Sequence, residues 1–136
     1  SSDYLNQLIE TIQQECSTST VEDLAKTVTG LAYEQTFVPK ILYAPDYSVS
    51  VSFSEHYPER FFIDAVSVRS NYSGALPFGL TIGMTSDALK AQFSEQYTEA
   101  PLEGYSDSLQ GMIEMEGVQI ELLLENGRVT YINYQV

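Results

Sequence analysis

The last stretch of the chain, residues 118–136, reads VQIELLLENGRVTYINYQV and decides the fold. Apolar and polar residues alternate on both sides of Asn126-Gly127, and a period of two is typical of a strand with one buried face. The dipeptide Asn-Gly is a strong signal for a tight turn between two antiparallel strands. The stretch therefore predicts a β-hairpin with strands over about 118–124 and 128–136.

The apolar face of this hairpin predicts its register. A two-residue turn would mix apolar and polar residues on one face, because a shift by one residue exchanges the two faces of a strand. A loop of residues 125–127 instead brings Ile120 opposite Ile132. We therefore predict the three-residue loop, with Gly127 in the left-handed conformation of a bulged turn. The opposite, wet face then carries Gln119, Glu121, Tyr131 and Asn133.

Short strands also precede this hairpin. Val49, Val51 and Phe53 alternate with serines, which indicates a half-buried strand. The same reasoning predicts strands at about 41–43, 60–69 and 109–116, and a loop at 55–59. Residues 94–108 have no clear periodicity, and the proline and glycine among them favour a long loop.

Three segments have helical spacing. Apolar residues fall on one face of residues 3–16 and of residues 21–29, which predicts an amphipathic helix over each segment. A third helix is predicted over 86–93, because Thr85 can cap its first turn and Asp87 lies in that turn. Leu89 and Phe93 are its expected buried pair. The chain is thus predicted to be a single α+β domain over 1–136, in which an antiparallel sheet carries helices mainly on one face.

The two halves of the chain resemble each other. Four apolar strand positions of the first half recur 69 residues later, and each half reads as a capped helix followed by three short strands. The segments 18–70 and 84–136 are therefore candidate tandem repeats, although chance similarity can produce much of this pattern in an α+β chain. The matched positions are Val49, Val51, Phe53 and Ile63 with Val118, Ile120, Leu122 and Ile132.

The composition is strongly acidic. Nineteen acidic residues against six basic ones give a formal net charge of −13. Such a surface repels nucleic acid and anionic membranes, and it attracts a basic partner and accelerates the encounter. Solubility alone explains the charge equally well.

The residues needed for catalysis are scarce. His56 is the only histidine and Cys16 the only cysteine. Cys16 continues the apolar face of 3–16 and is expected to be buried, so a Ser-His-Asp or Cys-His mechanism is not supported. Glu114, Glu116 and Glu121 could form a carboxylate pair, but alternating acids usually mark the wet face of a strand. We expect no enzymatic activity, no cofactor and no metal site.

The expected compartment is the cytoplasm. A single cysteine allows no internal disulfide, and the first residues contain neither a basic start nor an apolar run typical of a signal peptide. The protein would be periplasmic if an export signal had been removed.

Tyrosines and carboxylates gather in the predicted loop at 94–108. Tyrosine offers rigid contact area and carboxylates offer charge, which is how a surface for a basic protein is built. A solvated loop whose tyrosines fold back onto the sheet is the equally weighted alternative. The predicted partner-binding residues in the loop and on the wet face of the hairpin are Glu95, Tyr97, Glu99, Glu103, Tyr105, Asp107, Glu121 and Tyr131.

The segment LPFGLTIGMT at residues 76–85, followed by Leu89 and Phe93, resembles a segment of small bacterial immunity proteins, including the pyocin-type families. Its Gly-Met-Thr-plus-helix unit is also similar to the helix-then-strands module of the β-lactamase inhibitor protein and of the outer-membrane assembly lipoprotein family. The chain departs from the pattern after the helix, where a Gly-x-Pro is common and this chain has Ser94 to Tyr97. The resemblance implies an inhibitor of a cognate toxin domain, and together with the acidic charge it predicts a basic nuclease-type toxin. A non-catalytic scaffold of the bacterial envelope is the alternative.

Overall fold

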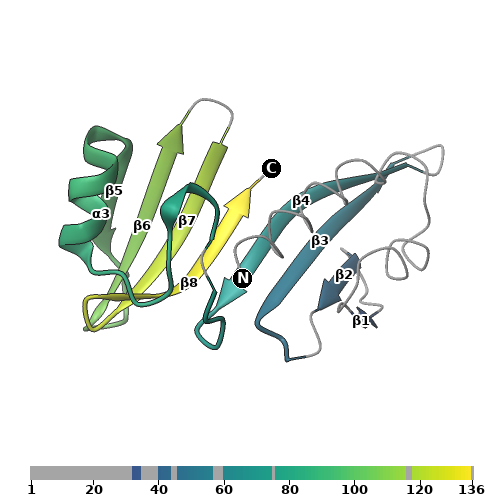
Figure 1. Cartoon of the computed structure of the whole chain (residues 1–136), viewed down its shortest axis with the longest axis horizontal. Coiled ribbons are helices and arrows are strands. Elements are labelled where there is room, and N and C mark those ends of the chain that lie inside the picture. The colour runs from purple at the N-terminus through teal and green to yellow at the C-terminus, as the bar shows by residue number, and fades with distance from the viewer. Residues whose placement is uncertain are drawn as a thin grey trace.

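The computed structural model describes residues 32–34, 40–43, 46–56, 60–74, 76–115 and 118–135. These residues form one antiparallel sheet of eight strands, and the α-helix among them, α3 (Ser86–Phe93), lies against one face (Figure 1). An antiparallel sheet with a helix on one face is therefore confirmed, although sheet predominates in the described part. The helices predicted over 3–16 and 21–29, and Cys16, lie outside the described residues.

The strand order places the second and first halves of the chain side by side. The sheet runs β1-β2-β3-β4-β8-β7-β6-β5, so that β4 and β8 meet at its centre and β1 and β5 form its edges. The strands are β1 (Ala32–Glu34), β2 (Lys40–Tyr43), β3 (Val49–His56), β4 (Arg60–Arg69), β5 (Tyr97–Pro101), β6 (Ser108–Met115), β7 (Val118–Glu125) and β8 (Arg128–Gln135).

The core lies on one face of this sheet. Alternate residues of the central strands are buried there, as the period of two predicts, and Leu89 and Phe93 of α3 pack onto them together with Leu76 and Leu80. The opposite face, which we call the open face, carries half-buried polar and apolar side chains. The buried strand residues are Val49, Val51, Val66, Val68, Ile113, Ile120, Leu122, Leu124, Val129, Ile132 and Tyr134.

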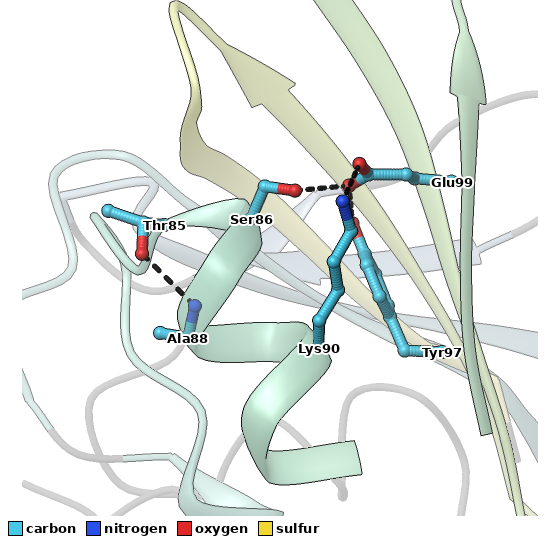
Figure 2. A network of polar contacts seen from close by, with 6 residues as sticks. All are labelled: Thr85, Ser86, Ala88, Lys90, Tyr97 and Glu99. Atoms are coloured by element: carbon cyan, nitrogen blue, oxygen red, sulfur yellow. Dashed lines mark hydrogen bonds and ion pairs between the residues drawn. The ribbon is translucent and has the colours of Figure 1, made fainter. Parts of the chain in front are cut away.

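Helix α3 begins as the sequence predicts. The Thr85 Oγ1 accepts a hydrogen bond from the Ala88 N–H at 3.2 Å, which satisfies one of the free amide groups of the first turn (Figure 2). Asp87 lies in that turn, close to the positive end of the helix dipole. Leu89 and Phe93 are buried, as expected.

The hairpin between β7 and β8 corrects the predicted register. Its turn has two residues, Asn126 and Gly127, both with positive φ, and Glu125 pairs with Arg128. The left-handed conformation of Gly127 is confirmed, but the three-residue loop is wrong.

A bulge inside the hairpin explains the error. Leu124 pairs with Val129, whereas Leu123 pairs with Tyr131, so Thr130 is an extra residue on β8. The extra residue restores the alternation of faces that a two-residue turn alone would disturb. As a result Ile120 lies opposite Tyr134, not Ile132, while the apolar face stays consistent.

Two predicted loops also contain regular structure. Residues 94–108 were expected to be a loop, but they begin with the 3-10 turn η2 (Ser94–Gln96) and continue as strand β5. Strand β3 extends through His56, which the sequence placed in the loop at 55–59. The connector before α3 contains a second 3-10 turn, η1 (Pro77–Gly79).

Several turns meet at one end of the sheet, which we call the loop end; it consists of residues 46–48, 69–74, 81–85, 102–107 and 126–127 (Figure 1, lower part of the view). The Asn126 N–H donates to the Asp107 carbonyl at 3.0 Å, and the Gly83 N–H donates to the Val129 carbonyl at 2.8 Å. These bonds join segments that are far apart in the sequence, so the loop end is a connected surface.

Candidate functional site

Two of the predicted binding residues belong to a polar network beneath α3. The Glu99 Oε2 accepts hydrogen bonds from the Ser86 hydroxyl and from the Tyr97 hydroxyl, each at 2.6 Å (Figure 2). The Lys90 Nζ lies 2.9 Å from the Glu99 Oε1. A single carboxylate thus connects the first turn and the middle of α3 to strand β5.

The network changes the proton affinity of its members. Burial alone would raise the pKa of Glu99, but hydrogen bonds from Ser86, Tyr97 and Lys90 outweigh it and lower this pKa below its usual value. The hydrogen bond to Glu99 raises the pKa of Lys90. Burial and the neighbouring carboxylate raise the pKa of Tyr97, so its hydroxyl remains a donor.

The ring of Tyr97 fits over a glycine. A Cβ atom on Gly111 of β6 would lie 2.9 Å from the Tyr97 Cε1 and 3.0 Å from its hydroxyl oxygen. Tyr97 is 6% exposed, and the Glu99 side chain is 18% exposed. The expectation that Tyr97 and Glu99 lie on an exposed loop is therefore wrong, because their side chains are engaged between β5 and α3.

Three other predicted residues lie together on an ordered turn. We call residues 102–107 the acidic loop, since it presents Glu103, Tyr105 and Asp107. The Tyr105 N–H donates to the Leu102 carbonyl at 3.1 Å, and the Leu102 N–H donates to the Ser108 carbonyl at 2.9 Å. Glu103 and Asp107 are exposed, and Tyr105 is 65% exposed.

Of the remaining three predicted residues, Glu95 lies apart, whereas Glu121 and Tyr131 are neighbours, because Glu121 pairs with Asn133, two residues from Tyr131. Glu95 lies in η2, at the end of β5 opposite the loop end. Glu121 and Tyr131 lie on the open face, where Glu121 accepts a hydrogen bond from the Gln135 Nε2 at 2.9 Å and the Tyr131 hydroxyl donates to the Ser67 Oγ at 3.1 Å. The eight predicted residues are thus distributed over both faces and both ends of the sheet.

A short path on the open face connects Tyr131 to the acidic loop. Tyr131 pairs with Leu123, and Glu125 follows two residues later on the same face of β7. Glu125 pairs with Ser108, the residue next to Asp107. The acidic loop and this corner of the open face therefore form a continuous surface to which Glu125 adds a third exposed carboxylate.

Two exposed aromatic residues were missed by the sequence reasoning. Tyr47 is 58% exposed with φ 60°, and Phe78 is 48% exposed with φ 65°. The Phe78 ring is stacked on that of Tyr134, with ring centroids 6.4 Å apart. No sequence signal identifies either residue, because a large side chain at positive φ runs against the local preference for Gly, Asn or Asp.

The described part of the chain contains neither a cluster of metal-binding side chains nor a helix that could span a membrane. Among those residues no group of three or more histidine, cysteine or acidic side chains is placed to hold a metal ion. None of their helices has the length and apolar character needed to cross a bilayer.

Comparisons with known proteins give little further information. No family model matches the chain, and no curated protein matches it. Among solved structures it is similar to that of a DUF4309 family protein (YjgB) from Bacillus subtilis subsp. subtilis str. 168, with a TM-score of 0.49 and 10% sequence identity over 96% of each chain.

Proposed function

We propose that this chain is an immunity protein that binds a basic bacterial toxin domain and neutralises it without catalysis. The observation that carries the proposal is the acidic loop, an ordered turn on which the exposed Tyr105 lies between the exposed Glu103 and Asp107. An exposed tyrosine among carboxylates combines contact area with electrostatic attraction for lysine and arginine.

The exposed carboxylates near the acidic loop outnumber the cations near it. From residue 71 to the end of the chain the basic residues are Lys90 and Arg128. Lys90 pairs with Glu99. The Arg128 Nη1 donates to the neutral Gly83 carbonyl at 2.9 Å, so Arg128 keeps its charge and is one cation against three exposed carboxylates, those of Glu103, Asp107 and Glu125. Exposed carboxylates in the same part of the chain therefore favour a cationic partner.

The immunity function rests on the sequence resemblance of residues 76–85 together with this charge. A toxin that cleaves nucleic acid needs a positive cleft, and an acidic protein can occupy or border such a cleft. Long-range attraction would accelerate capture of the toxin. We place this protein, and the capture, in the cytoplasm. An envelope scaffold remains the alternative, and gene neighbourhood separates the two: an immunity gene lies beside its toxin gene.

We further propose that the chain consists of two tandem units, each a helix followed by strands. The sheet order supports this, because β1-β2-β3-β4 and β5-β6-β7-β8 occupy mirrored places about the β4–β8 pair. A shift of 69 residues also moves β3 (Val49–His56) onto β7 (Val118–Glu125). Within this proposal the loop end belongs to a single surface built by both units.

The test uses the toxin domain encoded beside this gene, inactivated in its catalytic site. The double variant Glu103→Gln/Asp107→Asn should slow association several-fold at low salt, and the difference should disappear by about 0.5 M salt, where screening is strong. Asp87→Asn/Glu114→Gln is the matched control, because it also removes two exposed carboxylates, both outside the acidic loop. Absence of any binding by the unmodified chain would refute the immunity function, and equal slowing by both variants would refute the role of the acidic loop.

A further inference from the structure

The second exposed tyrosine of the loop end is held by a dense set of hydrogen bonds. The Tyr47 carbonyl accepts from the Arg69 Nη1 at 3.2 Å, and the preceding Asp46 carbonyl accepts from the Asn71 Nδ2 at 2.9 Å. The Asp46 Oδ1 accepts from both the N–H and the hydroxyl of Ser48, at 2.9 and 2.6 Å. The backbone on both sides of Tyr47 is therefore fixed.

This arrangement holds a large side chain in an unfavourable backbone conformation. Tyr47 has φ 60°, a region in which a Cβ atom crowds the backbone and where glycine, asparagine and aspartate are the usual residues. Its side chain is nevertheless 58% exposed, so burial in the core does not account for a tyrosine at this position. A strained, well-supported residue on a surface is a reason to look for a binding role.

Tyr47 and the acidic loop lie at the same end of the sheet. Tyr47 lies two residues before the first residue of β3, and Tyr105 lies three residues before that of β6, which is four strands away in the order β3-β4-β8-β7-β6. Because neighbouring strands are about 4.8 Å apart, the two tyrosines are separated by roughly 20 Å. That span matches one side of a protein–protein interface of ordinary size.

We propose that the loop end is a two-anchor docking surface in which Tyr47 and Tyr105 both contact one folded, basic protein. The inference rests on the proposed function and extends its site from the acidic loop to the first half of the chain. The two arginines of this end, Arg69 and Arg128, donate to backbone carbonyls of the loops they support. The exposed acids around the anchors are Asp46, Glu103, Asp107 and Glu125.

Charge decides between a basic partner and a second copy of the chain. Two loop ends brought face to face would oppose like charges, which is unfavourable. A basic surface instead pairs with the carboxylates near both anchors. The hydrogen bonds that fix the Tyr47 backbone also favour binding of a partner, because a contact side chain on a fixed backbone loses little conformational freedom when it binds.

The test replaces Tyr47 with a residue that suits its backbone. In Tyr47→Asn the anchor ring is removed, whereas the positive φ becomes more favourable for the residue, and the thermal midpoint and circular dichroism check that the variant is folded. Affinity for the inactivated toxin domain encoded by the neighbouring gene should fall about 30-fold, as for a central contact residue. Tyr47→Phe is the matched control and should retain most of the affinity, because the ring remains.

Each other outcome has a separate meaning. If Tyr105→Ala weakens binding and Tyr47→Asn does not, the two-anchor surface is refuted while the proposed function stands. If the unmodified chain does not bind, the proposed function itself is refuted, and this inference with it. If sedimentation shows that the chain self-associates and that Tyr47→Asn abolishes the association, the occupant is a second copy and the inference is wrong.

Discussion

Strand β5 and the acidic loop contain the same kinds of residue and use them in opposite ways. Tyr97 and Glu99 are joined to each other and to α3, and they hold the helix on the sheet. Only a few residues further on, Glu103, Tyr105 and Asp107 are exposed on a turn. The difference comes from the surroundings: β5 has a helix over its inner side, and the acidic loop projects past the end of the sheet (Figure 1). Residue type alone therefore does not separate a structural tyrosine from a contact tyrosine.

The largest effect is expected when one tyrosine in each region is truncated. Tyr97→Ala should lower the free energy of unfolding by about 3 kcal/mol or more, because it removes a buried ring and leaves a cavity under α3. Tyr105→Ala should change it by less than about 0.5 kcal/mol, as is usual for an exposed side chain. Urea unfolding followed by circular dichroism measures both. Similar losses of unfolding free energy in the two variants would show that Tyr105 supports the fold as much as Tyr97 does.

A smaller change sharpens the role of the glycine beneath Tyr97. Gly111→Ala should destabilise the fold by about 1–3 kcal/mol, because the added methyl group would overlap the Tyr97 ring and force it to move. The sign is informative, since alanine normally suits a strand interior better than glycine does. The same unfolding assay applies. If the variant is more stable than the unmodified chain, the close packing of Tyr97 on β6 is not a constraint.

The smallest expected effect comes from neutralising the shared carboxylate. Glu99→Gln should cost about 1 kcal/mol near neutral pH, because the charged acceptor of the Ser86, Tyr97 and Lys90 bonds is lost. The pKa of Glu99 is lowered in the folded state, so its stabilisation is complete above the unfolded value, about 4.3, and is lost as pH falls through the folded value. Unfolding measured from pH 7 to pH 3 should therefore show the gap between the two proteins closing below about pH 4. A gap that widens with acid would contradict the lowered pKa.

Sequence patterns predicted the elements whose signals are local. The cap of α3 depends on Thr85 and its own first turn, and the strands around Asn126-Gly127 depend on simple alternation. The register of that hairpin was missed because the bulge at Thr130 has no sequence marker. Strand β5 was missed because Glu99 points inward, and two of the three groups that make an inward carboxylate acceptable, Lys90 and Ser86, come from a separate element.

The candidate site was predicted less well than the fold, for a related reason. Sequence reasoning grouped residues that are neighbours along the chain, but strand β5 ends within that segment and divides it into a packed part and an exposed turn. Tyr97 was thus grouped with Tyr105, although the structure separates them, and Tyr47 was overlooked although it lies at the same end of the sheet as Tyr105. Only the strand order brings 46–48 and 102–107 to one end.

The outer edge of β5 has a consequence for the behaviour of the protein at high concentration. The Leu102 N–H donates to the Ser108 carbonyl, at the start of β6. Because the direction of the amides alternates along a strand, those of Thr98 and Ala100 also point toward β6. The amides of Tyr97 and Glu99 therefore point outward, away from the sheet. The Tyr97 amide is already used by the Ser94 carbonyl, and Pro101 has none. Glu99 is left as the one outward N–H donor of this strand, so a strand of another chain could form only part of the usual ladder here, and edge-to-edge aggregation is disfavoured on this side.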